Sequence, residues 1–294
     1  MSNCHGIVVG MDGGGSGCRV AVARVENGAV GRVLGRGQGG PANPATDFQV
    51  ALDNLRGAIH SAWAQAGLPE DDLPKVRAFA GLAGVRDEEM ARRVAQALPF
   101  VNSQVVEDRL TSVTGALAGE NGSVAPIGTG SFLARQTAQG VRYLGGWGLA
   151  LGDDASGAWL GQQLLRQMVR CFDGIAPHCD LSQQALAEFN HDHARIFRFS
   201  SSAGPARFAK FAPMVVEAAK QGDPLGHELM TRGADYIVAG LAALGYETGE
   251  RLCLSGGLGP HYADYLPAPY RDAMRPPKGN ALDGALYLAA RGAG

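Results

Sequence analysis

Two short glycine-rich turns, one in each half of the chain, constrain the fold most. The first is Asp12-Gly13-Gly14-Gly15-Ser16, set between apolar runs at residues 7–10 and 18–23. Two β-branched runs separated by a glycine cluster predict a strand, a sharp reversal and a second strand. Successive glycines can adopt positive φ and turn their N–H groups toward one point, so this turn can cradle a phosphate. An ordinary hairpin with an exposed aspartate is the alternative for this segment taken alone.

The second half of the chain repeats this pattern. Residues 123–127 predict a strand, Gly128-Thr129-Gly130-Ser131 a glycine turn, and residues 132–136 the return strand. A third strand follows in each half, at residues 29–34 and 140–144. Two copies of one supersecondary unit predict two similar domains. We expect a nucleotide to lie between them.

Helices and further strands follow the three-stranded meander in each half. Thr46 or Asp47 can cap a helix whose apolar residues recur at spacings of three and four from Phe48 to Ala66, and Gly67 ends it. The other predicted elements are strands 76–80 and 103–108, a helix opened by Asp87, a short helix 111–118, a helix 156–170, a largely helical region 181–244, a strand 251–255, and a final helix capped by Asn280.

Composition limits the class of protein. A length of 294 residues favours two domains, and 46% apolar with 18% charged residues predicts a well-packed globular chain. A net charge of −2 gives no reason to expect a nucleic acid or an acidic membrane as partner. The N-terminus has no secretory pattern, and no run reaches the roughly 18 apolar residues of a membrane span. We therefore expect a cytoplasmic protein.

The five cysteines are scattered and odd in number, which favours reduced thiols over a disulfide framework. Cys171, His178, Cys179 and His191 fall within one stretch and could supply zinc ligands, although no metal-site spacing relates them.

Glycine is the most over-represented residue, with 43 copies. At that frequency a Gly-x-Gly-x-x-Gly pattern is expected by chance, and one occurs at Gly35, Gly37 and Gly40. Prolines rather than a helix follow it, so its context excludes a dinucleotide-binding loop.

As a set, the motifs resemble those of the sugar kinase, Hsp70 and actin superfamily. Within it, the chain resembles the N-acetylglucosamine kinase and BadF/BadG/BcrA/BcrD ATPase group, particularly the bacterial glucosamine and N-acetylglucosamine kinases. The segments that carry the resemblance are residues 12–16, 40–44, 128–131, 145–148, 152–159 and 254–257. The resemblance implies an α/β fold of two ribonuclease-H-like, actin-like ATPase domains with a nucleotide cleft between them. It implies one domain at residues 1–118, joined by the C-terminal helix 281–294, and a second at 119–280 with a helical insert.

The resemblance also implies a function, an ATP-dependent amino-sugar kinase that phosphorylates the 6-hydroxyl of N-acetylglucosamine or glucosamine. Mg²⁺ would accompany ATP, and Asp12 would hold it through water. Asp108 would be the catalytic base on the sugar hydroxyl, and Asn43, Trp147 and Asp153 would line the sugar pocket with it. The residues implied around ATP are Gly13, Gly14, Gly15, Ser16, Gly128, Thr129, Gly130, Ser131, Ser255, Gly256 and Gly257.

Each of these side chains also has a purely structural alternative. Asp108 precedes a helical pattern and could be a helix N-cap. Asn43 could be a turn residue between two prolines, Trp147 a packing residue, and Asp153 a helix cap. Glu107 is the alternative base, but strand alternation points it to the opposite face from Asp108.

Two further functions belong to other classes. One is an ATP-driven activator of a radical dehydratase, in which cysteines at a dimer contact bind an iron–sulfur cluster; Cys171 and Cys179 are the available pair. The other is a non-enzymatic sugar sensor, for which the sequence offers no attached DNA-binding segment. The expected partners are a small-molecule amino sugar and ATP, with a homodimer possible and neither nucleic acid nor a membrane.

Overall fold

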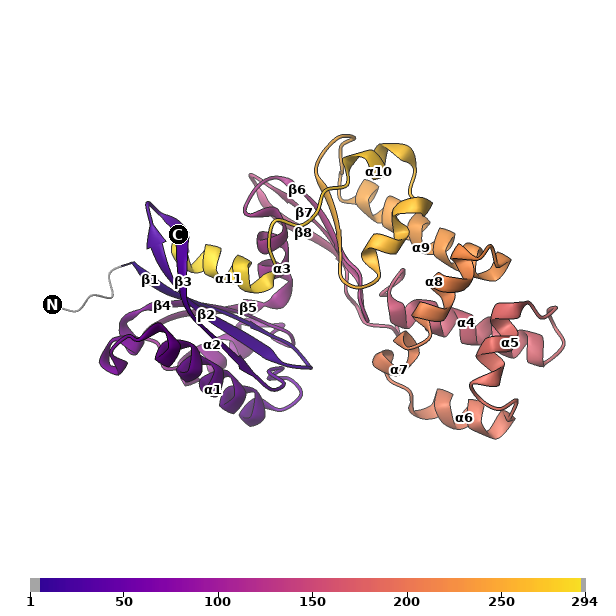
Figure 1. Ribbon diagram of the computed structural model, residues 1–294, viewed down its shortest axis with the longest axis horizontal. Helices are drawn as coiled ribbons and strands as arrows, with labels where there is room; N and C mark the ends of the chain where they lie inside the picture. The colour runs from indigo at the N-terminus through magenta and orange to yellow at the C-terminus, as the bar shows by residue number, and fades with distance from the viewer. Residues whose placement is uncertain (1–5, 292–294) are drawn as a thin grey trace. The chain divides into compact units, whose positions relative to one another are not determined.

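The computed structural model describes residues 6–291 and divides into two compact units. The first unit is formed by the chain up to Glu120 and again from Pro277, and the second by Asn121–Pro276 (Figure 1). Cys4, the N-terminal segment judged for a secretory pattern, and the last three residues of the predicted helix 281–294 lie outside the described residues. Among the helices within residues 6–291, none combines the length and the apolar character that crossing a bilayer requires.

A five-stranded sheet in the order β3-β2-β1-β4-β5 forms the centre of the first unit. Its strands are β1 (Ile7–Gly13), β2 (Cys18–Glu26), β3 (Ala29–Gly39), β4 (Arg77–Leu82) and β5 (Asn102–Glu107). β1, β2 and β3 pair antiparallel, whereas β1, β4 and β5 pair parallel. The carboxyl ends of the three parallel strands therefore meet at one edge, which is where open α/β sheets bind ligands.

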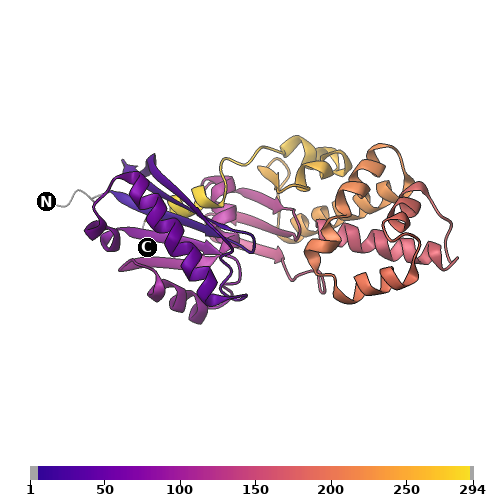
Figure 2. The same cartoon turned by 60° about the horizontal axis from the view of Figure 1, so that its bottom comes forward.

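Helices cover both faces of this sheet. They are α1 (Phe48–Ala66), α2 (Glu88–Ala97), α3 (Asp108–Leu117) and α11 (Ala281–Arg291), with a short 3₁₀ helix η1 (Glu70–Lys75). Alternate strand residues point to opposite faces, so Val9 packs into the core that includes α1 and Val8 into the core that includes α11. Figure 1 shows α1 and α11 on opposite sides of the sheet, and Figure 2 shows the dark purple helix α1 lying against the strands.

Helix α1 confirms the predicted pattern. The Asp47 carboxylate accepts a hydrogen bond from the Val50 N–H at 3.0 Å, and Gly67 ends the helix with a φ of 66°. The buried residues include Leu52, Leu55, Ile59 and Trp63. Helix α11 begins as predicted, because the Asn280 side chain accepts from the Leu282 N–H at 2.9 Å.

Strand β3 runs five residues beyond the predicted end at residue 34. Gly35 and Gly37 alternate along this extension and face α1. A Cβ on Gly35 would lie 2.1 Å from the Ala62 carbonyl oxygen, and a Cβ on Gly37 would lie 2.0 Å from that of Ala58. The glycines thus let helix and strand approach more closely than any side chain permits. They also weaken the local signal for a strand, which is why the sequence pattern stopped early.

We expect Gly37→Ala to destabilise the protein by about 3 kcal/mol, because the new methyl group would meet helix backbone rather than a movable side chain. Gly57→Ala, on the exposed face of α1, is the matched control. Its Cβ would meet nothing within 4 Å, so we expect a gain of about 0.5–1 kcal/mol from helix propensity. Denaturant unfolding followed by circular dichroism measures both changes. Equal stability of the two variants would contradict the close contact between strand and helix.

The second unit repeats the first unit's strand plan. Its sheet has the order β8-β7-β6-β9, with β6 (Gly122–Pro126), β7 (Phe132–Thr137), β8 (Gly140–Gly145) and β9 (Leu252–Ser255). β6, β7 and β8 form an antiparallel meander, and β9 pairs parallel with β6. This matches the order β3-β2-β1-β4 of the first unit. The predicted repetition of one supersecondary unit is confirmed.

Most of the second unit is helical. Its helices are α4 (Gly157–Phe172), α5 (Asp180–Ala187), α6 (His193–Ser202), α7 (Pro205–Ala209), α8 (Ala212–Lys220), α9 (Pro224–Ala243), the 3₁₀ helix η2 (Gly259–Tyr265) and α10 (Ala268–Ala273). The sequence did not predict η2 or α10, because one or two helical turns leave too short a hydrophobic pattern to identify.

Candidate active site

Two carboxylates and the first glycine turn line one pocket of about 460 Å³ in the first unit. The residues around it are Asp12, Gly13, Gly14, Ser16, Gly17, Cys18, Arg19, Gln38, Gly39 and Asp108. The parallel pairing of β1, β4 and β5 explains the arrangement, since residues at the carboxyl ends of these strands meet at one edge. Of the residues assigned from the sequence, the structure thus brings Asp12, Gly13, Gly14, Ser16 and Asp108 together.

The first glycine turn is held by its backbone. The Gly14 N–H donates to the Gly17 carbonyl at 2.9 Å, and the Gly13 carbonyl accepts from the Ala83 N–H at 2.8 Å. The expectation of positive φ is wrong here, because Gly13, Gly14 and Gly15 all lie outside that region. A Cβ on Gly13 would lie 2.8 Å from the Leu82 side chain, whereas Gly14 and Gly15 face open space. Glycine at these positions therefore leaves the backbone open to close approach by a ligand.

Asp12 forms an ion pair with Arg19 across the β1–β2 ladder. Arg19 donates to Oδ2 of Asp12 from Nη2 and, at 3.1 Å, from Nε. Mg²⁺ takes oxygen ligands and is usually held by one or two carboxylates together with waters and substrate phosphates. The Asp12 carboxylate and the Ser16 hydroxyl in this pocket fit that donor set. Within residues 6–291 no group of three or more His, Cys, Asp or Glu side chains forms a protein-only metal cage.

Asp108 is the first residue of α3, and the packing of α3 fixes its place. The Thr111 hydroxyl donates to the Asp108 carbonyl at 2.9 Å. A Cβ on Gly81 of β4 would lie 2.0 Å from the Thr111 hydroxyl oxygen, and one on Gly284 of α11 would lie 2.0 Å from the Thr111 carbonyl oxygen. The first turn of α3 is therefore packed tightly between β4 and α11, and this packing fixes the position of the Asp108 backbone.

The N-cap alternative for Asp108 is wrong, because the N-cap position belongs to Glu107 and β5 ends there rather than at Asp108. The Glu107 side chain makes no capping bond and pairs with Arg109 at 2.6 Å. Burial raises the pKa of the Asp108 carboxyl above its ordinary 3.8, and the negative charges of Glu107 and Asp12 raise this pKa further. Arg109 opposes the rise and does not cancel it. A carboxylate with a raised pKa is a stronger base.

Asn43 lies next to the residues that follow β4. A Cβ on Gly84 would lie 2.1 Å from its Oδ1. That oxygen accepts from the Ala45 N–H at 3.0 Å and the Thr46 N–H at 3.2 Å, so the predicted turn role is observed. The side-chain oxygen is thus used to shape the loop, and the amide nitrogen is the group left to contact a ligand.

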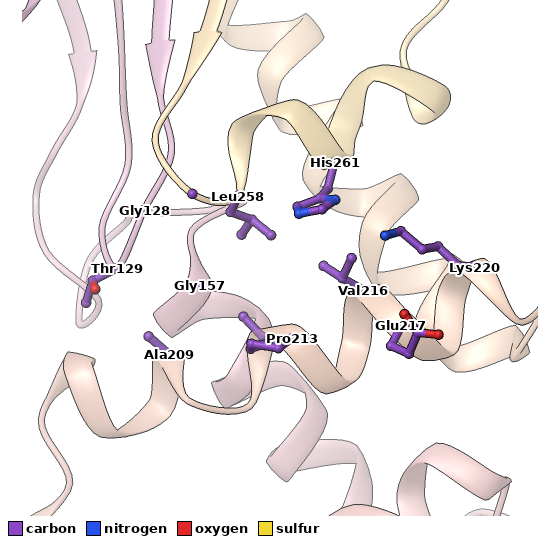
Figure 3. A pocket seen from close by; sticks show the side chains of 12 residues that line it. Gly128, Thr129, Gly157, Ala209, Pro213, Val216, Glu217, Lys220, Leu258 and His261 are labelled. Carbon is purple, nitrogen blue, oxygen red and sulfur yellow. The ribbon is translucent and has the colours of Figure 1, made fainter. Parts of the chain in front are cut away.

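A second pocket, of about 600 Å³, lies in the second unit (Figure 3). Its walls come from the β6–β7 turn, the helices α7 and α8, and the connection after β9. The residues around it are Gly128, Thr129, Gly157, Ala209, Ala212, Pro213, Val216, Glu217, Lys220, Gly257, Leu258 and His261. Gly128, Thr129 and Gly257 were assigned to ATP from the sequence. The helical wall and His261 were missed, because Pro213 and Val216 show only a spacing that ordinary core packing also produces.

Gly256 explains how two of these segments come together. It has a φ of 78°, and a Cβ there would lie 2.3 Å from the Ile127 carbonyl oxygen. That same oxygen accepts from the Leu258 N–H at 3.0 Å and the Gly259 N–H at 3.3 Å. The turn after β9 is therefore bonded to the end of β6, just before the second glycine turn.

The second glycine turn caps helix α4. The carbonyls of Gly128 and Thr129 accept from the Gly157 and Ala158 N–H groups at 2.8 and 3.1 Å. The Ser156 hydroxyl accepts from the Trp159 N–H at 3.1 Å. The first N–H groups of α4 are thus used internally and are not available to a phosphate. The Thr129 and Gly130 N–H groups donate to no backbone carbonyl within the described chain, so they can serve a ligand.

Asp153 joins two loops rather than capping a helix, because Ser156 is the N-cap of α4. Its Oδ1 accepts from the Gly148 N–H at 3.0 Å, and a Cβ on Gly130 would lie 2.7 Å from its Oδ2. The loop between β8 and α4 is thereby tied to the second glycine turn. Trp147, near the start of that loop, is 72% exposed, so the interpretation of Trp147 as a packing residue is wrong.

The cysteine and histidine residues of the second unit do not form a metal site within residues 6–291. The Cys171 thiol is buried and donates to the Pro177 carbonyl at 3.1 Å, and His178 Nδ1 lies 3.0 Å from the Ser182 hydroxyl. Cys179 is half-buried at the start of α5. Nothing in the described chain favours the activator alternative.

Each unit carries a three-stranded meander, a glycine turn and an adjoining parallel strand, and this architecture defines the class of two-domain, actin-like ATPases. Comparison with known proteins narrows the class. The chain belongs to the BadF/BadG/BcrA/BcrD ATPase family, whose model matches residues 9–264. The predictions of this family, of an actin-like α/β fold and of ATP use are confirmed.

Named relatives extend over most of the chain. It is 35% identical over 286 residues to the glucosamine kinase of Vibrio cholerae serotype O1, covering 96% of this chain and 95% of the relative. It is 24% identical over 278 residues to the N-acetyl-D-glucosamine kinase of Dictyostelium discoideum, covering 85% of each.

Solved structures agree on the fold. A Chromobacterium violaceum structure assigned to N-acetylglucosamine kinase matches with a TM-score of 0.85 and 30% identity, over 96% of this chain and 98% of that one. A ROK family glucokinase from Streptomyces griseus, 18% identical, matches with a TM-score of 0.54 over 97% and 98% and shares the fold.

Proposed function

We propose that the chain is an ATP-dependent amino-sugar kinase that phosphorylates the 6-hydroxyl of N-acetylglucosamine or glucosamine, with Asp108 as base. Family membership and kinase relatives over nearly its whole length support a phosphotransferase. The observation that carries the proposal is the first pocket, in which a carboxyl of raised pKa shares one cavity with Asp12 and an open glycine turn.

Asp108 would do the proton chemistry. It orients the attacking hydroxyl and accepts its proton as the bond to phosphorus forms. Phosphoryl transfer otherwise needs the reacting oxygens held in line and the phosphate charge neutralised. The Gly15 N–H at the open first glycine turn, and the Thr129 and Gly130 N–H groups, would donate to phosphate oxygens. Asp12, with Ser16, would hold Mg²⁺, which when bound neutralises charge on the triphosphate.

Sugar recognition would fall to Asn43, Trp147 and Asp153. Each sugar hydroxyl must exchange water for a fixed partner, and amides and carboxylates provide such partners. The exposed Trp147 ring supplies an apolar face of the kind that a sugar ring covers. Asp153 would act partly through the loop, since its carboxylate already fixes the position of Gly148.

A coupled ADP-release assay across hexoses and hexosamines tests the proposal. We expect glucosamine or N-acetylglucosamine to have the highest kcat/KM, and phosphorus NMR of the product to show a phosphomonoester on C6. ADP release that is independent of every sugar would contradict the kinase assignment. Sugar binding without ADP release would favour the sensor.

The second pocket is the proposed adenosine site, and Ala209 at its wall tests it. We expect Ala209→Phe to fill the pocket and to raise KM for ATP about tenfold or more, equivalent to about 1.4 kcal/mol of binding. The KM for the sugar should stay unchanged. Ala206→Phe on the exposed side of the same short helix is the matched control. Steady-state kinetics and ATP-induced thermal shifts measure both variants. An unchanged KM for ATP in Ala209→Phe would show that the adenosine does not bind in this pocket.

A further inference from the structure

We propose that the second unit holds a separate binding site for a sugar phosphate, between helices α4 and α9. A cavity of about 490 Å³ lies there, outside both pockets described above. Three arginines line it, Arg166 and Arg170 from α4 and Arg232 from α9. This concentration of guanidinium groups stands out in a chain whose net charge is −2.

Two of the three arginines, Arg166 and Arg170, are available to an anion. Arg166 and Arg170 are one helical turn apart and so share a face of α4. Neither forms an ion pair within the described chain. Arg232 already forms an ion pair with Glu228, which also lines the cavity, at 3.6 Å. Planar guanidinium groups match the oxygen geometry of a phosphate.

The rest of the lining favours a sugar phosphate over a bare anion. Trp159 lines the cavity but is largely buried, and the Arg232 guanidinium lies over its ring, 5.4 Å from the ring centre. This contact holds Arg232 at the cavity wall. Gln163 and Gln167 also come from α4, and Gln163 Oε1 accepts from Arg232 at 3.3 Å. Side-chain amides hydrogen-bond hydroxyl groups. A sugar phosphate carries such hydroxyl groups on its ring, in addition to the phosphate that the arginines would bind.

This inference rests on the proposed function, because the product of that reaction is an amino-sugar 6-phosphate. A structural link connects the cavity with the second glycine turn. Asp154 lines the cavity, and its carbonyl accepts from the Ser131 hydroxyl at 2.6 Å. An occupant that displaces Asp154 would therefore displace the turn. The product would inhibit its own formation from a site that the substrate sugar does not fill.

The test uses the full chain and a double variant, Arg166→Gln with Arg170→Gln. Glucosamine 6-phosphate is titrated by calorimetry in saturating glucosamine, which fills the catalytic sugar site. We expect one bound molecule per wild-type chain and at least about tenfold weaker binding to the double variant. Arg271→Gln, an exposed arginine on α10, is the matched control and should bind as the wild type does. In kinetics, product inhibition should be mixed against glucosamine in the wild type and competitive in the double variant.

Three results would overturn the site: no binding to the wild type, equal binding by wild type and double variant, or equal binding of inorganic phosphate and glucosamine 6-phosphate. Glucose 6-phosphate separates this site from the proposed function. If the chain phosphorylates no sugar but binds glucose 6-phosphate through the two arginines, the site stands and the kinase assignment falls. If the chain phosphorylates amino sugars and the arginine substitutions do not change binding of the sugar phosphate, the kinase assignment stands and the separate site falls. Circular dichroism checks that each variant is folded.

Discussion

Asp108→Asn is expected to lower kcat by about 10²–10⁴-fold while sugar affinity stays nearly the same. Asparagine keeps the size of the side chain and its hydrogen bonds to a hydroxyl, but it cannot accept the proton. Coupled ADP release gives kcat, and calorimetry with the sugar alone gives the affinity. The control is Glu107→Gln, whose carboxylate pairs with Arg109 and is not among the residues that line the first pocket. An active Asp108→Asn beside an inactive Glu107→Gln would make Glu107 the base.

The raised pKa of Asp108 gives the same variant a second, independent signature. Burial makes the ionised carboxylate unfavourable in the folded protein. The destabilisation is absent below the unfolded-state pKa, grows as pH rises toward the higher folded-state pKa, and is fully present above it. Asp108→Asn should therefore have a higher Tm than the wild type at pH 7, and the difference should vanish in acid.

The pH profile of the wild type follows from the same shift. The base works only when ionised, so kcat should fall as pH drops through a pKa above the ordinary 3.8 of an aspartate. Glu107→Gln removes a negative charge that raises this pKa, so its acid limb should move to lower pH. Identical acid limbs in wild type and Glu107→Gln would contradict the electrostatic account of the site.

Gly256→Ala is expected to damage both stability and ATP binding. The left-handed backbone costs an L-residue about 1–2 kcal/mol, and the contact of the new Cβ with the Ile127 backbone adds about 1–3 kcal/mol. Ile127 directly precedes the second glycine turn, so relief of the contact must move that turn or the turn after β9. We expect a lower Tm and a KM for ATP raised about tenfold or more.

Gly257→Ala is the matched control for Gly256→Ala. Gly257 has no positive φ, and a Cβ on it would meet nothing within 4 Å in the protein. Its Tm should match that of the wild type, and any rise in KM for ATP would report contact with the nucleotide alone. Thermal unfolding with and without ATP separates the two effects. A Gly256→Ala variant as stable as Gly257→Ala would contradict the arrangement of the two turns.

Much of the fold follows from local sequence patterns. The meanders were predicted because β-branched runs and glycine turns alternate, and α1 because Asp47 and Gly67 mark its two ends. The strand prediction ended too early in β3, where glycine lowers the strand propensity and also permits close packing. In β3, Gly35 and Gly37 interrupt the strand signal, yet they are there because α1 lies so close to them. The need for glycine at these positions comes from the packing of β3 against α1, so the sequence of neither element alone can predict it.

The residues of the candidate site also fall into a group that the sequence predicted and a group that it did not. Asp12 and Asp108 were assigned through the resemblance to the kinase family, and both lie at the end of a predicted strand. Parallel pairing of these strands then places them in one pocket. Asn43 shapes its loop, as its place between two prolines had indicated. Asp153 ties two loops together, a role that no spacing predicts. The wall formed by Pro213, Val216 and His261 was missed because these residues come from distant segments with no shared motif.

Helix α11 has a consequence for how the chain acquires its structure. Leu282 and Leu286 of this helix share a core with Val8 and Phe79 of the first sheet, although the whole of the second unit is synthesised between them. Until α11 has been synthesised, the part of the sheet face around Val8 and Phe79 that this helix covers therefore stays exposed. We expect chaperones that bind exposed apolar surfaces to bind this part of the sheet during synthesis.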